Sequence, residues 1–506
     1  MIDIPEFRPL RITQSDAGPG RKQIDTLDQL LVVVPKNPNA TAFRGLPTAT
    51  ALSRLFKSAK KSGPDPLTTH LDNKRGTAIT LASIETGRQF ELLTRARNLI
   101  AESGRLGASK LGLVVLGFEP NDRERIVSAV IRAADAASFK LTTYASKPSR
   151  KKRAIRSLKL LGQDHRLELK TLRTGNLGNN LARWLTALPP NKLTAAAYRA
   201  IAQSLAKDYA LSYEFIGIDR LKRLGAGAFL AVAQGNARDD AGIIHLCYRP
   251  SGTATPALAL VGKGILFDTG GNNLKPFKGM LDMHMDMQGS AVALGTAVEL
   301  AAAQVPYAFD VWLAVTENVV SATAYKSQDV ITTANGTTIQ VIHTDAEGRM
   351  VLADTLALAA DAKPGLIIDY ATLTGTCVSA LSTRYSGVFS NRAGAVRDLL
   401  GASDNSGERV WPFPLDEDFD EPLQSSVADI KQCSPEGAAD HIMATRFLKR
   451  FVPDSIPWIH MDMSAGQHKG GLGAIATEVT GFGVAWTLAL LSGRDPAELG
   501  ASWPVE

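Results

Sequence analysis

Three short segments in the second half of the chain carry ionisable residues at the ends of apolar runs. They are 261–276, with Lys263, Asp268 and Lys275; 283–289, with Asp286; and 343–349, with Asp345, Glu347 and Arg349. In an α/β sheet, binding and catalytic side chains gather at the ends of strands. These three segments therefore lie where an α/β sheet builds its sites.

Lys263 lies between Gly262 and Gly264 inside an apolar run that reads as a buried strand. Burial disfavours a charged amine, so its side chain must either extend to solvent or meet a strong partner. A metal ion is one such partner. An amine that loses its proton can become a metal ligand when carboxylates complete the site.

The carboxylates raise a charge problem if the fold brings them together. Asp345 and Glu347 are two positions apart, so in an extended link they point to the same side. Asp286 precedes an apolar helix, where a carboxylate favoured by the helix dipole is the alternative interpretation. Together with Asp268, these groups cannot all stay ionised without added positive charge.

Divalent metal ions would supply that charge. Oxygen ligands with one amine and no thiolate suit Mg, Mn or a catalytic Zn, and a two-metal site needs one carboxylate to bridge. Such a pair can lower the pKa of a bridging water and create a hydroxide nucleophile. The chemistry that follows is hydrolysis of a carbonyl or phosphoryl compound.

The ordered motifs V-G-K-G-x-x-F-D-T-G-G, L-K-P, D-M-x-G and T-D-A-E-G-R resemble the leucine aminopeptidase family, the cytosolic two-metal M17 peptidases. The resemblance runs from about Ala182 to Val484. It implies metal ligands at Lys263, Asp268, Asp286, Asp345 and Glu347, with Asp268 and Glu347 shared. It also implies that Lys275 polarises the scissile carbonyl and that Arg349 holds a bicarbonate acting as proton shuttle.

The same resemblance implies an activity and an assembly. A hydroxide bridging two Zn or Mn ions would hydrolyse the N-terminal bond of peptides with a leucine-like first residue. The expected pocket residues are Met283, Thr372 and Gly375, although Met283 and Thr372 could instead be ordinary core or turn residues. The family assembles as hexamers, so a homohexamer is expected.

Two departures from the family pattern lie near these residues. His343 stands where the family usually has Asn, and a histidine there could in principle add a ligand. Residues 433–441 replace a stretch that is commonly glycine-rich around an arginine. That change could reshape the substrate pocket or a subunit contact.

The elements that must position the site read as two α/β domains. Apolar runs at 30–34 and 111–118 predict buried strands, and a helix start follows at 119–122. Beyond a Gly-, Asn- and Pro-containing connection, strand-like runs alternate with helical stretches at 291–303 and 349–362. We predict an N-terminal domain, 1–185, that packs in the oligomer, and a catalytic domain, 191–506, with a boundary near Pro190 and a mixed sheet sandwiched by helices.

Composition narrows the class of protein. Of 506 residues, 45% are hydrophobic and 21% charged, which excludes disordered and membrane classes. Residues 1–6 show neither the basic stretch nor the apolar run of a signal peptide, so we expect a cytoplasmic protein. The three cysteines are far apart without a C-x-x-C pair, so we expect small buried residues and neither disulfides nor a thiolate zinc site.

Two alternatives to the peptidase remain open. The net charge of +6 and the basic run at 147–153 permit DNA binding as a secondary activity, although a solvated loop is the simpler interpretation. A relative that kept the fold and lost catalysis would lack a ligand, and the sequence retains all the expected ones.

Overall fold

The computed structural model describes residues 3–7, 9–38, 42–62, 66–147, 154–163, 165–173, 175–250 and 255–504. Most of the basic run, 148–153, lies outside these residues, so the DNA-binding prediction has no structural account. The contacts divide the chain into two units. The larger contains Met1–Glu6, Leu177–His468 and Val479–Glu506, and the smaller contains Phe7–Asn176 and Lys469–Glu478.

The smaller unit is built on a six-stranded sheet in the order β1-β6-β5-β2-β4-β3. Its pairs are parallel except for β3 with β4. The strands are β1 (Arg11–Ser15), β2 (Gln29–Pro35), β3 (Leu67–His70), β4 (Ala78–Ile84), β5 (Lys110–Val115) and β6 (Ser157–Leu161), and the helices are α1 (Arg21–Ile24), α2 (Ala49–Ser62), α3 (Gln89–Leu106), α4 (Pro120–Ser138) and α5 (Leu169–Leu172).

Helices cover both faces of this sheet, which explains the uninterrupted apolar run at 30–34. Leu31 and Val33 pack in one core with α3 and α4. Leu30 and Val32 pack in the other core with residues of α2. The buried strands and the helix start that the sequence predicted here are confirmed.

A late segment of the chain, Lys469–Glu478, belongs to the smaller unit. Ala474 joins the core that α3 and α4 form. Arg97 on α3 donates from Nη1 to the backbone oxygen of Ile475, at 3.0 Å. The smaller unit is therefore discontinuous in sequence, and the contacts divide the chain at Leu177, earlier than the boundary expected near Pro190.

The larger unit is built on an eight-stranded mixed sheet in the order β15-β14-β17-β13-β9-β10-β8-β7. The four strands from β17 to β10 are parallel, while β14 runs antiparallel to β17, and β8 runs antiparallel to β10 and β7. The bounds are β7 (Ser212–Gly217), β8 (Gly242–Tyr248), β9 (Leu258–Asp268), β10 (Phe309–Asn318), β13 (Ile367–Ala371), β14 (Ser386–Ser390), β15 (Val410–Pro412) and β17 (Trp458–Asp462).

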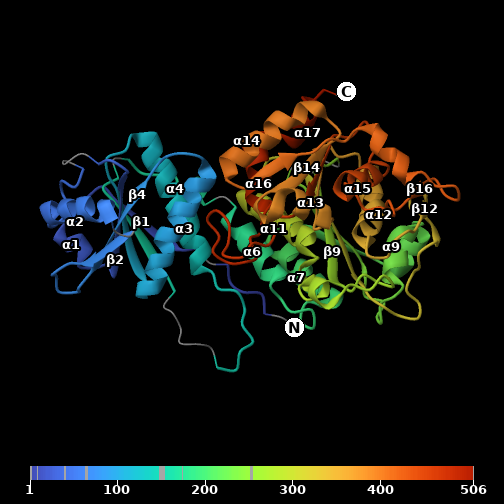
Figure 1. Cartoon of the computed structure of the whole chain (residues 1–506), viewed down its shortest axis with the longest axis horizontal. Coiled ribbons are helices and arrows are strands. Elements are labelled where there is room, and N and C mark those ends of the chain that lie inside the picture. Colours follow the sequence, from blue (N-terminus) through green and yellow to red (C-terminus); the bar gives the residue numbers. More distant parts are fainter. Residues whose placement is uncertain are drawn as a thin grey trace. The chain divides into compact units, whose positions relative to one another are not determined.

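Helices sandwich this sheet, as predicted (Figure 1). One face packs against α11 (Gln288–Ala303) and α16 (Val484–Leu491), and the other against α9 (Gly227–Ala233), α12 (Glu347–Asp361) and α15 (Asp440–Lys449). Gly289 lets α11 approach closely, because a Cβ there would lie 2.0 Å from the backbone oxygen of Tyr370. Within the described ranges, no helix is both long and apolar enough to cross a membrane.

Shorter elements complete the larger unit. The helices are α6 (Asn176–Thr186), α7 (Ala195–Asp208), α8 (Ile218–Arg223), α10 (Phe277–Met280), α13 (Gly375–Leu381), α14 (Val396–Ser406) and α17 (Pro496–Ala501). A small three-stranded sheet contains β11 (Val330–Thr332), β12 (Thr338–Gln340) and β16 (Ile430–Lys431).

Asp354 on α12 connects its helix to α9 and to the turn between β11 and β12. Its carboxylate accepts from the backbone nitrogens of Phe229 and Ala334, each at 2.8 Å. Asp354→Ala leaves both N–H groups without this acceptor, at about 1–3 kcal/mol for each buried group. We expect a lower urea unfolding midpoint, whereas Asp361→Ala, an exposed position on the same helix, should change it little. Equal midpoints for the two variants would contradict the assigned role.

Candidate functional site

Lys263 is held inside β9 by carboxylates from two other segments. Its Nζ lies 2.8 Å from Asp286 Oδ2 and 3.0 Å from Glu347 Oε1, and it donates to the backbone oxygen of Thr372 at 2.9 Å. The side chain is 3% exposed. Gly348 makes room for it, because a Cβ there would lie 2.6 Å from Lys263 Nζ. The carboxylates are the strong partner that a buried lysine requires.

Lys275 joins the other two predicted carboxylates. Its Nζ lies 2.8 Å from Asp268 Oδ2, and it also forms an ion pair with Asp345. Asp268 is the last residue of β9, while Lys275 and Asp345 lie in loops. The fold therefore brings together segments 261–276 and 343–349, as expected.

Asn318 is a residue of this site that sequence analysis missed. It ends β10, is 1% exposed, and its Nδ2 donates to Asp268 Oδ1 at 2.8 Å and to Glu347 Oε2 at 3.4 Å. Only one signal could have found it: a polar residue at the carboxyl end of an apolar strand, the position that Asp268 has on β9. Asn318 fixes the orientation of both carboxylates.

Glu347 reaches the site in a different way from the one expected. It is the first residue of α12, so it does not lie in an extended link with Asp345. The two side chains nevertheless line the same cavity, because the turn before α12 presents Asp345 while the first helical turn presents Glu347. The extended link that the spacing suggested is therefore wrong, although both side chains line one cavity.

The electrostatics of the site favour added positive charge. Burial and the nearby Glu347 raise the pKa of Asp268 well above its usual range, and burial raises the pKa of Asp286 to about 7. Burial also opposes ionisation of Glu347, but Lys263 and Lys275 outweigh it and lower its pKa. Fully ionised, the four carboxylates, Asp345 included, would carry more charge than the two lysine ammonium groups offset.

The donor set fits a divalent metal. Oxygen atoms of Asp268, Asp286 and Glu347 lie within 4.8 Å of one another. All three residues are buried, so the excess negative charge is poorly screened by water. Buried carboxylates gathered in this way are characteristic of hard or borderline divalent ions.

A cavity of about 380 Å³ opens onto these groups. Every predicted site residue except Arg349 lines it: Lys263, Asp268, Lys275, Met283, Asp286, Asp345, Glu347, Thr372 and Gly375. Apolar lining comes from Met285, Leu373, Val378 and Met463. Thr372 also donates from Oγ1 to Asp286 Oδ1 at 2.6 Å, so it orients a carboxylate as well as lining the cavity.

Arg349 is not among the described residues that line the cavity, and it is paired with a carboxylate of the chain itself. Its Nη1 and Nη2 donate to the two oxygens of Asp440 at 2.9 and 2.6 Å, and Nη1 also donates to the backbone oxygen of Gln432. Asp440 belongs to the departing segment 433–441. Both Nη atoms therefore already face an anion and do not fit a bicarbonate as well, whereas the buried Nε has no hydrogen-bond partner among the described residues.

His343 also lies away from the cavity. It is exposed, and its Nδ1 accepts from the backbone nitrogen of Asp345 at 3.2 Å. The residues that line the cavity, among those the structure describes, do not include it. Nothing in this arrangement supports His343 as an additional ligand.

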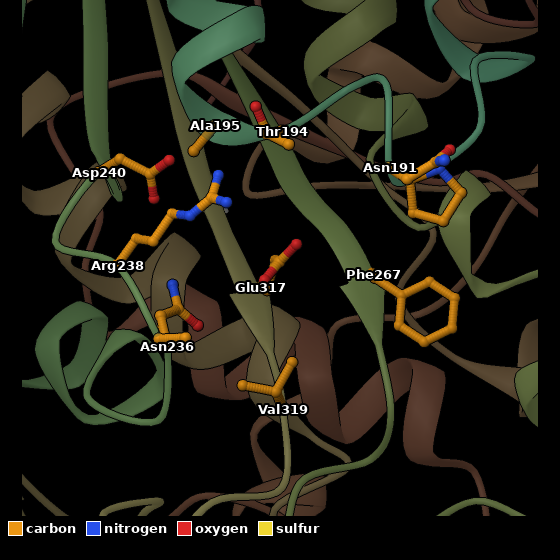
Figure 2. Close-up of a pocket in the computed structure, with 11 residues that line it drawn as sticks. Asn191, Thr194, Ala195, Asn236, Arg238, Asp240, Phe267, Glu317 and Val319 are labelled. Atoms are coloured by element: carbon orange, nitrogen blue, oxygen red, sulfur yellow. The ribbon is translucent and has the colours of Figure 1, made fainter.

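A different cavity of about 390 Å³ lies near the start of α7. Arg238, Asp240 and Glu317 extend into it from the loop before β8 and from β10 (Figure 2). It lacks the clustered carboxylates and lysines of the first cavity. The first cavity is therefore the candidate active site.

Known proteins resemble this chain over most of its length. Residues 180–488 match the model of the cytosol aminopeptidase family, catalytic domain. A probable cytosol aminopeptidase of Parasynechococcus marenigrum is 37% identical over 87% of this chain and 91% of its own length. One from Syntrophotalea carbinolica is 41% identical over 62% of this chain and 63% of its own. The structure of a mutant of tomato leucine aminopeptidase is similar over 96% of both chains, with a TM-score of 0.81 and 26% identity.

Proposed function

This chain belongs to the cytosol aminopeptidase family, and from that premise we propose that it removes leucine-like residues from the amino terminus of peptides with two divalent ions. The family makes it a metal-dependent hydrolase of N-terminal peptide bonds. The observation that carries the finer proposal is the cluster of Asp268, Asp286 and Glu347 around Lys263. Zn and Mn are the proposed metals.

The residues that would hold the ions are Lys263, Asp268, Asp286, Asp345 and Glu347. Two ions held there would lower the pKa of a shared water toward neutrality, so that it attacks the peptide carbonyl as hydroxide. For Lys263 to act as a ligand, its amine must give up a proton that the surrounding carboxylates now stabilise. Asn318 keeps Asp268 and Glu347 oriented throughout.

Lys275 would stabilise the charge that develops on the carbonyl oxygen. Its ammonium lines the cavity and is held in place by Asp268 and Asp345. A cationic donor that is fixed before the reaction needs little reorganisation when the oxyanion forms. The substrate's free, uncharged α-amino group would bind one of the ions, so a charged or blocked amino terminus would be disfavoured. Peptides with an acetylated amino terminus are therefore expected to fail.

The test of this proposal is hydrolysis of a leucyl amide by the full-length protein. The protein is dialysed against chelator and then refilled with Zn or Mn, and the acetylated leucyl amide serves as the matched control substrate. We expect activity that depends on added metal and on a free amino group. A folded protein that hydrolyses neither substrate with either metal would overturn the proposal.

The apolar part of the cavity supports the leucine-like preference. Gly375 lines it, and a Cβ built there meets no atom within 4 Å. Gly375→Val should therefore fold and fill pocket space, lowering kcat/KM for leucyl amide by about 10-fold or more and for alanyl amide by less. Gly401→Val, another glycine with open space at Cβ, is the control. Equal losses on the two substrates would contradict the assigned pocket.

The pairing of Arg349 with Asp440 predicts how the enzyme responds to bicarbonate. Because both Nη atoms donate to Asp440, wild-type kcat should not change when bicarbonate is added. Asp440→Ala frees the guanidinium, and its activity should rise with bicarbonate. Initial rates in bicarbonate-free buffer, with and without the added anion, check both statements. Activation of the wild type would show that Asp440 does not occupy this position in solution.

Further features of the proposal come from the family resemblance. They are a homohexamer and a cytoplasmic location; the relatives above are named cytosol aminopeptidases. DNA binding at 147–153 stays a prediction. A steep salt dependence of retention on DNA that is lost on neutralising this run would support it.

A further inference from the structure

A second cluster of metal-binding residue types lies at the far end of the catalytic sheet. His245 and Cys247 on β8 face Asp310 on β10, and their ligand atoms all lie within 4.8 Å of one another. Asp310 lies near the start of β10, whereas Asn318 of the candidate active site is its last residue. The two clusters therefore occupy opposite ends of one strand.

The register of the strands explains why these three residues meet. Cys247 is the antiparallel partner of Asp310, and His245 is the partner of Trp312. Since alternate residues of a strand share a face, both pairs project on the same side of the sheet. Trp312 stacks on the imidazole with ring centroids 3.7 Å apart, which fixes the plane of the ring.

Two of the three ligand separations match the edges of a zinc coordination tetrahedron. His245 Nε2 lies 3.3 Å from Cys247 Sγ and 3.4 Å from Asp310 Oδ2. Zinc bonds of ordinary length at tetrahedral angles place neighbouring N, S and O ligands about 3.3–3.6 Å apart. One ring nitrogen thus faces a thiol and a carboxylate at the separation that a shared ion requires.

Supporting residues surround the three groups as they do in metal sites. Glu214 on β7 lies 3.6 Å from His245 Nδ1, the ring nitrogen that faces away from the cluster. Arg249 pairs with Asp310 Oδ1 at 2.5 Å and leaves Oδ2 directed at the histidine. A carboxylate on the distal nitrogen of a ligating histidine and a hydrogen-bonded ligating carboxylate are the usual outer contacts.

We propose that His245 Nε2, Cys247 Sγ and Asp310 Oδ2 bind a Zn²⁺ ion, separate from the catalytic metals, that ties β8 to β10. On binding, the thiol gives up its proton to solvent, and the imidazole binds as the neutral ring through an unprotonated Nε2, with its proton on Nδ1 facing Glu214. Solvent supplies the fourth ligand, because His245 and Cys247 are only partly buried. A C-x-x-C pair is not required when neighbouring strands supply the ligands, and for this reason a thiolate site was not expected from the sequence.

Cobalt distinguishes this site from the catalytic one, because the proposed catalytic ligands contain no sulfur. Metal-stripped full-length protein is titrated with Co²⁺ and followed for the near-ultraviolet sulfur-to-cobalt charge-transfer band. We expect the band in the wild type and in Cys377→Ser, which removes a buried cysteine elsewhere. Cys247→Ser should lose the band and bind one ion fewer per chain. Zinc should also protect Cys247 from alkylation.

Each outcome bears on the proposal. A wild-type protein that is folded and active but shows no thiolate band would overturn it, as would a band that survives in Cys247→Ser. Asp310→Asn and His245→Gln keep the thiol and test the other two ligands. Each should lower the protein's affinity for Co²⁺, measured from the rise of the band. If the wild type shows the band but does not hydrolyse leucyl amide, that result would count against the catalytic proposal alone.

Discussion

Glu347→Gln should lower kcat for leucyl amide by about 10³-fold or more, because this carboxylate is proposed to hold both ions and so to create the attacking hydroxide. The substitution preserves the shape of a side chain that is 1% exposed. It removes the negative charge that faces Lys263 at 3.0 Å, so bound metal should fall together with activity. Kinetics and metal analysis on the same preparation check both effects.

A matched control for this variant is Glu317→Gln. Glu317 is a partly buried glutamate on β10, but it faces the other cavity (Figure 2). The control should keep wild-type metal content and activity. If Glu347→Gln retained metal and lost less than about 10-fold in kcat, the shared-ligand role would be wrong.

Lys275→Met should lower kcat by about 10²–10³-fold while leaving the metal content unchanged. Methionine keeps the apolar stem of the side chain but cannot donate to an oxyanion. Because the interaction is proposed to strengthen as the reaction proceeds, KM should change far less than kcat. Steady-state kinetics at saturating metal separate the two constants.

Lys278→Met provides the comparison for Lys275. Lys278 is exposed on α10, three residues further along the same segment. Loss of metal in Lys275→Met would mean that the lysine organises Asp268 and Asp345 and does not act on the substrate. A loss confined to KM would equally contradict the oxyanion role.

The sequence predicted the part of the site that is encoded in short segments. Lys263 and Asp268 belong to one strand and its end, and a single run of residues specifies both positions. Asp286 and Glu347 each begin or precede a helix that packs on β9. Their convergence could be inferred because apolar strands of one sheet end at a common edge.

Residues that act through long-range pairing could not be predicted in this way. Asn318 comes 50 residues after its partner Asp268, and Asp440 comes 91 residues after Arg349. No local pattern specifies such a pair. The mixed character of the sheet was predicted, but its strand order depends on pairings such as β14 with β17, which are set by packing of distant segments.

The discontinuity of the smaller unit constrains the order of events during synthesis. Its first part ends at Asn176, yet the segment that contributes Ala474 and receives the Arg97 hydrogen bond is translated about 300 residues later. At ribosomal rates of about 5–20 residues per second, that interval is roughly 15–60 s. Nascent chains must therefore wait with an incomplete amino-terminal core while the catalytic sheet is made. A chain truncated before Lys469 would lack this segment and could not complete the core.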